Sequence, residues 1–247
     1  MFGVEEILLY PDHIQENQMR ELEFCEQIFG FIETPQYLRK RLYRLNPQLR
    51  FVGILPPLQT PHHSVASSIR DCKVGDLREG IVMGRRGDAL LVDAGLEHSV
   101  ECHGDLPVGI RVTIVLKNLE RNLVGEVVDK SKISIYWGYK VRRSKFSLGS
   151  LLEREEFDLK IGTSRYGARI VDLWSEIGCS LRSMKSALVA FGSPRMGLRE
   201  ILGQENRKAE EAFDFFVNTI PDQKVSTVRT EEAILISLGL LNLMRLR

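Results

Sequence analysis

The sequence predicts an α/β fold with a mainly parallel sheet, helices on both faces of that sheet, and a small inserted β-barrel. Strand-like and helix-like segments alternate through the C-terminal part of the chain, which is typical of layered α/β folds. Between residues 67 and 135, short strands punctuated by glycine take over, which suits a small barrel. At 247 residues and 43% hydrophobic composition, the chain can bury a sizeable core. We therefore expect a discontinuous domain of residues 1–66 and 136–247, interrupted by a barrel of residues 67–135.

Composition limits the classes of partner. Lys and Arg number 34 and Asp and Glu 33, so the net charge of +1 does not itself indicate a nucleic acid, and any basic surface must be local. The four cysteines are far apart without a CxxC pair, which argues against a zinc knuckle and a disulfide framework. We expect no bound metal and a reducing, cytoplasmic setting. The longest apolar run, Ala233–Met244, is too short to span a bilayer, and we expect no signal peptide and no membrane association.

The N-terminal segment predicts one short strand and two helices. Val4–Tyr10 has the composition of a strand, and apolar residues recur at helical spacing from Met19 to Ile32. Thr34 followed by Pro35 predicts an N-cap and a first-turn proline for a second helix that runs to Arg44. The basic residues of this second helix form either a solvated face or a contact for phosphate, and both interpretations stay open.

A buried strand and a proline-rich loop come next. Phe51–Leu55 predicts a buried strand, and Pro56 and Pro57 end it. His62 and His63 are adjacent and have no cysteine or carboxylate at ligand spacing. They therefore predict a loop rather than a metal site.

The insert is expected to contain five strands. These are Leu77–Met83, Ala89–Val92, His98–Cys102, Ile110–Leu116 and Leu123–Val128. The string from Gly80 to Gly95 resembles an S1 or OB-type fold, a scaffold often used for single-stranded RNA. Because the segment lacks an exposed aromatic stripe, an insert with no nucleic-acid role stays open.

After the insert, the chain is expected to return to the main sheet. Ser134–Val141 would be the returning segment, with Tyr136 and Trp137 in core or interdomain packing rather than base stacking. The elements that follow are a helix at Ser147–Glu156, a strand at Phe157–Ile161 and an amphipathic helix at Ala168–Ile177.

Two further strands end in loops that predict a ligand site. Ala187–Phe191 opens into the turn Gly192–Leu198, and Phe213–Ile220 opens into the loop Pro221–Thr230, which precedes an apolar helix, Glu231–Arg245. In parallel sheets, ligands bind beyond the carboxyl ends of adjacent strands, so these two loops would form a pocket rim. No GxGxxG or GxxxxGK[ST] follows any strand, which disfavours an ordinary Rossmann-type nucleotide enzyme.

The same loops carry a resemblance to a known family. FGSPRMGL and NTIPDQKVSTVRTEEAILISLGLLN resemble the second and third motifs of the SPOUT superfamily of RNA methyltransferases, and GTSR resembles the first. GILPPLQTPHH and YWGY narrow the resemblance to the archaeal and eukaryotic branch, whose members carry an OB-like insert. The resemblance covers nearly the whole chain. It implies a trefoil-knotted sheet, S-adenosylmethionine as cofactor, a homodimer, and RNA as partner, with ribosomal RNA as the target and N3 of uridine as the suggested atom.

The resemblance also implies the site residues. The cofactor-binding residues would be Gly162, Thr163, Ser164, Phe191, Gly192, Ser193, Pro194, Gly197, Ile220, Pro221, Val225, Val228 and Thr230. As catalytic residues, Arg165 would contact the target nucleotide or stabilise its deprotonated form, and Arg229 and Glu232 would orient substrate or cofactor. A sulfonium methyl is already activated, so alignment and loss of a proton suffice without a metal. From the residues alone, Arg165 also fits an ordinary surface arginine, and Glu232 a first-turn charge that favours the helix dipole.

Two questions stay open at this point, namely whether the protein is an enzyme and whether its sheet lacks one strand. A non-catalytic RNA-binding or RNA-chaperone protein with a vestigial cofactor pocket is the alternative to an enzyme. Members of the family usually begin with a strand and a helix ahead of the segment matched by Phe2–Val4. The resemblance therefore implies either a sheet without that strand or a longer parent sequence.

Overall fold

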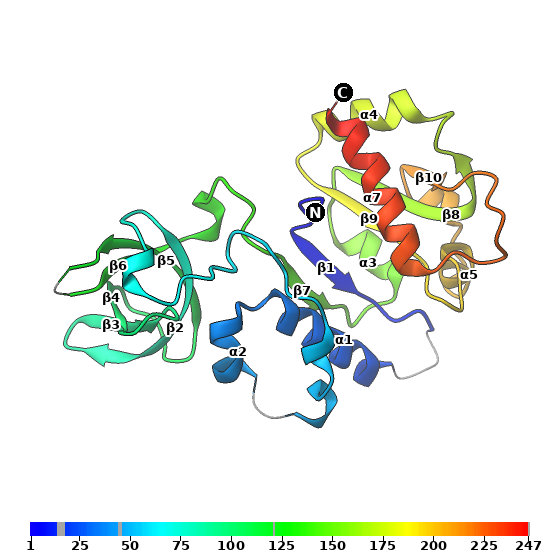
Figure 1. Ribbon diagram of the computed structural model, residues 1–247. Coiled ribbons are helices and arrows are strands. Elements are labelled where there is room, and N and C mark those ends of the chain that lie inside the picture. The colour runs from blue at the N-terminus through cyan, green and yellow to red at the C-terminus, as the bar shows by residue number, and fades with distance from the viewer. Residues whose placement is uncertain (14–17, 44–45, 121, 247) are drawn as a thin grey trace. The chain divides into compact units, whose positions relative to one another are not determined.

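The computed structural model of the protein describes residues 1–13, 18–43, 46–120 and 122–246 (Figure 1). Its internal contacts divide the chain into two compact units. The sheet unit comprises Met1–Val4, Leu8–Glu23 and Arg142–Arg247, and the barrel unit comprises Glu5–Ile7 and Phe24–Val141. The barrel therefore belongs to a compact unit that already includes the chain from Phe24 onward. The domain boundaries at residues 66 and 136 stay a prediction. No helix in the described ranges is long and apolar enough to cross a membrane.

Five short strands close into the expected barrel. They are β2 (Leu77–Arg86), β3 (Ala89–Asp93), β4 (Val100–His103), β5 (Arg111–Asn118) and β6 (Val124–Val128), in the closed order β2-β3-β4-β6-β5. Alternate residues such as Leu90, Val92 and Ile114 point inward and are completely buried. A Cβ at Gly80 would lie 2.4 Å from the Val92 side chain, so this glycine allows β2 and β3 to approach each other. The predicted barrel and its five strands are confirmed.

The N-terminal helices form with one change of cap. α1 spans Met19–Glu33 and α2 spans Gln36–Leu42, close to the predicted limits. Thr34 does not cap α2, because its hydroxyl donates to the carbonyl of Gly30 (2.8 Å) and so closes α1 instead. Pro35 is the residue that precedes α2. The predicted end of this helix at Arg44 falls outside the described residues.

The strand predicted at Phe51–Leu55 is wrong. Val52–Ile54 is a short 3-10 helix, closed by bonds such as Ile54 N to Phe51 O (3.1 Å). The side chains that we expected to be buried are open to solvent, with Phe51 62% and Ile54 83% exposed. A strand needs a neighbour to accept its backbone hydrogen bonds, and no described strand pairs with this segment, so the chain satisfies these groups locally.

A buried polar network holds the barrel unit together. Arg111 of β5 donates two bonds to the Glu33 carboxylate (2.5 and 3.1 Å) and one to Glu79 of β2 (2.5 Å). Glu79 also accepts bonds from the Trp137 indole (2.6 Å) and from Thr113 (2.6 Å). Burial alone would raise the pKa of Glu79, but Arg111 and Lys130 more than offset it and hold that pKa below 4.5. Trp137 therefore has the packing role that the sequence favoured.

Two sequence motifs meet in this network. His62 is completely buried, and its Nε2 lies 2.9 Å from the Glu33 carbonyl oxygen and 3.2 Å from the Glu33 carboxylate. His63 Nε2 lies 2.8 Å from the same carbonyl. Gly138 has a φ of +83°, and a Cβ there would lie 2.4 Å from the Glu33 carboxylate. The PHH loop and the YWGY segment are therefore packed on the end of α1, and the two histidines are structural residues.

The sheet unit is built on three parallel strands. β8 (Leu159–Arg169) lies between β9 (Ala187–Ala190) and β10 (Phe215–Asn218), in the order β10-β8-β9. Among the described strands, β7 (Lys140–Arg143) pairs with β1 (Glu6–Leu9) alone, in a separate two-stranded sheet. The predicted return of Ser134–Val141 to the main sheet is therefore wrong, because β1 takes the hydrogen bonds of this segment, as Lys140 N donates to Glu5 O (2.9 Å).

Helices cover both faces of this sheet, as predicted. They are α3 (Leu148–Arg154), α4 (Trp174–Ser183), α5 (Leu198–Gly203), α6 (Ala209–Ala212) and α7 (Thr230–Leu246). α4 and α7 pack together on the face of Val217, and α3, α5 and α6 pack on the face of Phe216 (Figure 1). The helix predicted at Ala168–Ile177 starts instead at Trp174, since β8 continues to Arg169.

Removing the Glu79 charge should destabilise the barrel unit. At neutral pH we expect Glu79→Gln to lower the free energy of unfolding by about 3 kcal/mol, because Arg111 loses one of its two buried partners. The folded-state pKa of Glu79 is lowered, so its contribution is present above pH 4.5 and is lost as the pH falls. Urea unfolding at pH 7 and pH 4 should therefore show a difference from wild type that shrinks in acid.

The matched control is Glu126→Gln, which breaks the solvent-exposed pair of Glu126 with Lys117 in the same barrel. This variant should unfold almost like wild type at both pH values. Equal stability of Glu79→Gln and Glu126→Gln would show that the buried network does not stabilise the barrel unit.

Candidate functional site

The three predicted cofactor motifs lie at one edge of the parallel sheet. Because β8, β9 and β10 are parallel, their carboxyl ends meet at the same edge, with β8 in the centre. The chain leaves β9 at Phe191 and β10 at Thr219. The first motif was predicted to follow a strand that ends at Ile161. This prediction is wrong, because β8 runs through the motif to Arg169.

A shift in register leaves the first motif after Gly162 without a partner in β10. Gly162 lies opposite Phe216 and Ala168 lies opposite Val217, so the segment Thr163–Gly167 has no partner in β10. A Cβ at Gly162 would lie 2.5 Å from the Phe213 ring, and a Cβ at Gly167 would lie 2.5 Å from the backbone of Val217. The two glycines therefore allow the chain to leave and rejoin the ladder. We call the segment Thr163–Gly167 the β8 bulge.

The second motif is a tight turn attached to the β8 bulge. The Thr163 hydroxyl donates to the carbonyl of Ala190 (2.9 Å), where β9 ends. Ser193 N donates to Met196 O (2.9 Å), and the Ser193 hydroxyl accepts from Met196 N (3.1 Å). A Cβ at Gly192 would lie 2.7 Å from the carbonyl oxygen of Met196, which is backbone of the same turn. Gly192 is thus required by the turn itself, whether or not a ligand lies beside it.

An N-terminal segment supports the second motif, and sequence reasoning missed it. The Tyr10 hydroxyl donates to the carbonyl of Phe191 (2.5 Å), and Gln204 donates to the carbonyl of Asp12 (2.8 Å). Burial would raise the pKa of Asp12, but hydrogen bonds from Ser193 and Gln18 and the charge of Arg195 hold that pKa below its usual range. Only the position of this segment directly after the β1 strand could have suggested its role, since its contacts are far away in the sequence.

Asn218 ties the third motif to the β8 bulge. Its side-chain amide donates to the carbonyl of Arg165 (3.0 Å) and accepts from the backbone N–H of Ile220 (2.9 Å). The Arg165 guanidinium in turn donates to the carbonyl of Ser226 (3.0 Å) in the loop before α7. Asp222 has a φ of +59°, so the loop turns sharply after Pro221. The β8 bulge and the third motif are therefore one connected structure.

The remaining predicted residues differ in exposure. Phe191, Ile220, Pro221, Val228 and Thr230 are half-buried, whereas Pro194, Gly197 and Val225 are exposed. Half-buried apolar side chains beside small residues fit the adenosine part of S-adenosylmethionine, and in the described ranges no group of three His, Cys, Asp or Glu could hold a metal. The assignment of each cofactor-binding residue stays a prediction.

The three predicted catalytic residues are in different surroundings. Arg165 is exposed at the β8 bulge. Glu232 accepts a hydrogen bond from the backbone N–H of Arg229 (2.9 Å), a contact that caps the start of α7, and the Arg229 side chain is 76% exposed. The structure therefore gives Glu232 the helix-capping contact that we weighed against a catalytic role, and the roles of all three stay predictions.

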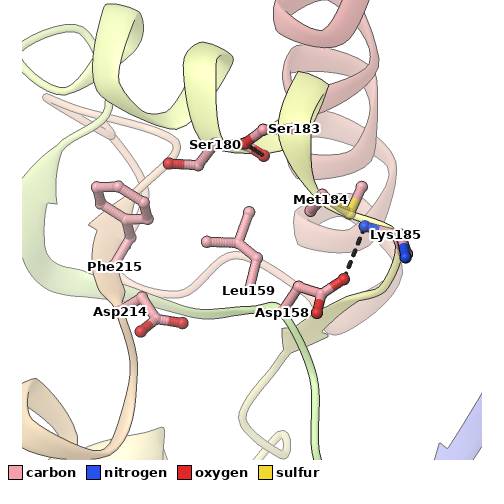
Figure 2. Close-up of a pocket in the computed structure, with 8 residues that line it drawn as sticks. All are labelled: Asp158, Leu159, Ser180, Ser183, Met184, Lys185, Asp214 and Phe215. Carbon is pink, nitrogen blue, oxygen red and sulfur yellow. Dashed lines mark hydrogen bonds between the residues drawn. The ribbon is translucent and has the colours of Figure 1, made fainter.

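A hollow of about 550 Å³ lies at the opposite edge of the sheet (Figure 2). Its lining includes Asp158, Lys185 and Asp214, which lie at the amino ends of the three strands. The Asp158 carboxylate accepts from the backbone N–H groups of Lys185 (2.7 Å) and Ser186 (2.9 Å), and Asp214 accepts from Lys160 N (2.7 Å). Both carboxylates thus tie loops together. Ligands of parallel sheets bind at the other edge, so this hollow is not our candidate site.

Comparison with known proteins identifies relatives along the whole chain. A family model described as "Putative RNA methyltransferase" matches residues 1–241. The 28S rRNA (uridine-N(3))-methyltransferases of Mus musculus and Homo sapiens are each 33% identical to this chain over 98% of its length and 67% and 69% of theirs. An uncharacterized protein of Halobacterium salinarum is 32% identical over 98% of this chain and 88% of its own length.

Adding one methyl group at Gly192 should disrupt the second motif. We expect Gly192→Ala to lose at least tenfold in affinity for S-adenosylmethionine, about 1.4 kcal/mol, because the new Cβ overlaps the backbone of the turn, which must shift to admit it. Gly203→Ala is the control, since a Cβ at Gly203 has no neighbour within 4 Å. Calorimetric titration of both variants is the measurement. Wild-type affinity in a folded Gly192→Ala variant would remove the second motif from the cofactor site.

Proposed function

This chain belongs to the family described as "Putative RNA methyltransferase", and we propose that it transfers a methyl group from S-adenosylmethionine to ribosomal RNA. The observation that carries this proposal is its similarity to two 28S rRNA (uridine-N(3))-methyltransferases over 98% of its length, which includes both the barrel and the three motifs. N3 of uridine is accordingly the proposed target atom. A purely RNA-binding role is not favoured, because these relatives are named as enzymes.

The proposed reaction needs alignment and removal of one proton. The sulfonium methyl would bond to N3 of uridine as its bond to sulfur breaks, the N3 proton would pass to solvent, and S-adenosylhomocysteine would be the second product. We assign the cofactor to the residues of the three motifs at the carboxyl edge. Arg165 fits a role in stabilising the uridine anion, because it is exposed at the β8 bulge and makes no ion pair with any described residue.

We also propose the SPOUT architecture for the sheet unit. Two observations support it. The second and third motifs follow β9 and β10 of a parallel sheet whose central strand, β8, contains the first motif, and the closing helix α7 packs on α4. In that architecture the loop before α7 passes through an earlier loop and forms the trefoil knot. The barrel is proposed to be an OB-like fold that contacts RNA, and its closed five-stranded form supports this.

A homodimer and a cytoplasmic location complete the proposal. The outer side of α7 exposes a row of large apolar residues, with Leu235 52%, Leu243 48% and Leu246 72% exposed. An apolar helix face of this kind favours an interface between two copies of the chain. The free cysteines in the described ranges are compatible with a reducing compartment.

Arg165 should matter for the reaction more than for cofactor binding. We expect Arg165→Gln to lower the turnover number by roughly 10²–10³-fold, as removal of one donor to a developing anion does, while affinity for S-adenosylmethionine changes little. The assay is transfer of labelled methyl to unmodified ribosomal RNA, with mass spectrometry of the modified nucleoside. Arg154→Gln, which removes an exposed arginine outside the three motifs, is the control. Full activity of Arg165→Gln would rule out this role, and no transfer by wild type would refute the proposed function.

The α7 row should set the oligomeric state. Light scattering is expected to give twice the monomer mass for wild type, and Leu235→Asp combined with Leu243→Asp should give the monomer mass. Val171→Asp is the control, because Val171 is equally exposed (52%) but lies outside α7. A monomeric wild-type protein that transfers methyl groups would contradict the proposed dimer.

A further inference from the structure

Tyr166 presents an aromatic side chain to solvent within the β8 bulge. Its side chain belongs to a segment held at both ends by the ladder with β10, and Tyr166 is nevertheless 54% exposed. Its backbone N–H donates to the Ser164 hydroxyl (3.2 Å), which fixes the turn of the bulge. Tyr166 thus lies on hydrogen-bonded backbone and leaves about half of its residue surface open to solvent.

Two arginines hold this ring in place. The Arg165 guanidinium lies 4.7 Å from the ring centroid and donates to the Tyr166 hydroxyl (2.6 Å). The Arg199 guanidinium lies 5.4 Å from the same centroid and donates to the Tyr166 carbonyl (3.1 Å). Such contacts restrict the two side-chain torsions of the tyrosine, so a ligand that stacks on the ring costs little conformational entropy.

The two arginines differ in how their charges are used. Arg199 pairs with Glu210 (2.6 Å) and also lies over the Phe216 ring (5.5 Å), so it is anchored to the sheet unit. Arg165 donates only to a carbonyl and to the tyrosine hydroxyl, and it forms no ion pair with any described residue. The cluster therefore offers a fixed aromatic surface next to one uncompensated positive charge.

Resting on the proposed function, we propose that Tyr166 is a stacking platform for an unpaired base of the RNA substrate, held beside the Arg165 guanidinium. An exposed aromatic ring beside a guanidinium is the chemistry that recognises single-stranded RNA, where bases are unstacked and accessible. A base in a duplex has both faces covered by its neighbours, so the platform selects single strands. Tyr166 would thus position the RNA beside the carboxyl edge of the sheet.

The ring, rather than the hydroxyl, should carry the binding. We expect Tyr166→Leu to bind a short single-stranded oligouridine about 5- to 150-fold more weakly than wild type, the range measured for removing one stacked base. Tyr166→Phe retains the ring and should stay within about threefold of wild type. Phe146→Leu is the matched control, since Phe146 is a 45% exposed aromatic under Arg154 (4.3 Å) that lies outside the three motifs.

Photocrosslinking tests the contact directly. Oligouridine that carries 5-iodouridine, irradiated with wild-type protein, should give a crosslinked peptide that contains Tyr166, and excess duplex RNA should not compete. Affinity for S-adenosylmethionine, measured on each variant, reports whether the cofactor site is intact. If Tyr166→Leu binds oligouridine as well as Phe146→Leu does, or the crosslink lies elsewhere, the platform is refuted.

The outcomes separate this inference from the proposed function. Wild-type protein that binds S-adenosylmethionine and methylates RNA, with Tyr166→Leu unimpaired in RNA binding, refutes only the platform. Wild-type protein that crosslinks RNA at Tyr166 but does not bind S-adenosylmethionine supports the platform and refutes the methyltransferase. Wild-type protein that binds neither ligand refutes both.

Discussion

The break in the ladder between β8 and β10 is the constraint on which the candidate site depends. Consecutive residues of β10, Phe216 and Val217, pair with Gly162 and Ala168 of β8, so the chain between them must leave the sheet. That excursion brings Arg165 within reach of Asn218 and of the loop before α7, and it exposes Tyr166. The site therefore arises from strand pairing and from two glycines.

The barrel unit depends on a different interaction. Arg111 bridges two buried carboxylates, one from α1 and one from the barrel, and Trp137 and His62 pack on them. Removing one charged partner from such a group leaves the other buried charge unpaired. This costs far more free energy than the intact group contributes to stability. The barrel is consequently tied to the residues before and after it, because Glu33 and Trp137 both take part in its buried polar network.

Periodicity and local chemistry predicted much of this molecule, and distant pairing accounts for the errors. The five barrel strands and α7 were predicted closely, since alternation and apolar runs are local signals. The strand predicted at Phe51–Leu55 was wrong because an apolar run forms a strand only where a neighbouring strand pairs with it. Two residues of the site show the same limit of sequence-based prediction. The backbone that surrounds Gly192 and the Phe191 carbonyl that Tyr10 contacts are brought into place only by the fold. The sequence motifs predicted the carboxyl edge of the sheet as the site. The contacts among the residues at that edge could be seen only in the structure.

We propose that the carboxyl edge of β10-β8-β9 holds the cofactor and that the hollow at the amino edge does not. Hydrogen exchange of the protein with and without S-adenosylmethionine, followed by mass spectrometry of its peptides, tests this claim directly. We predict slower exchange in peptides that cover 162–167, 191–197 and 218–229, and no change in those that cover 180–186. Protection confined to the peptides around Asp158, Lys185 and Asp214 would contradict the account.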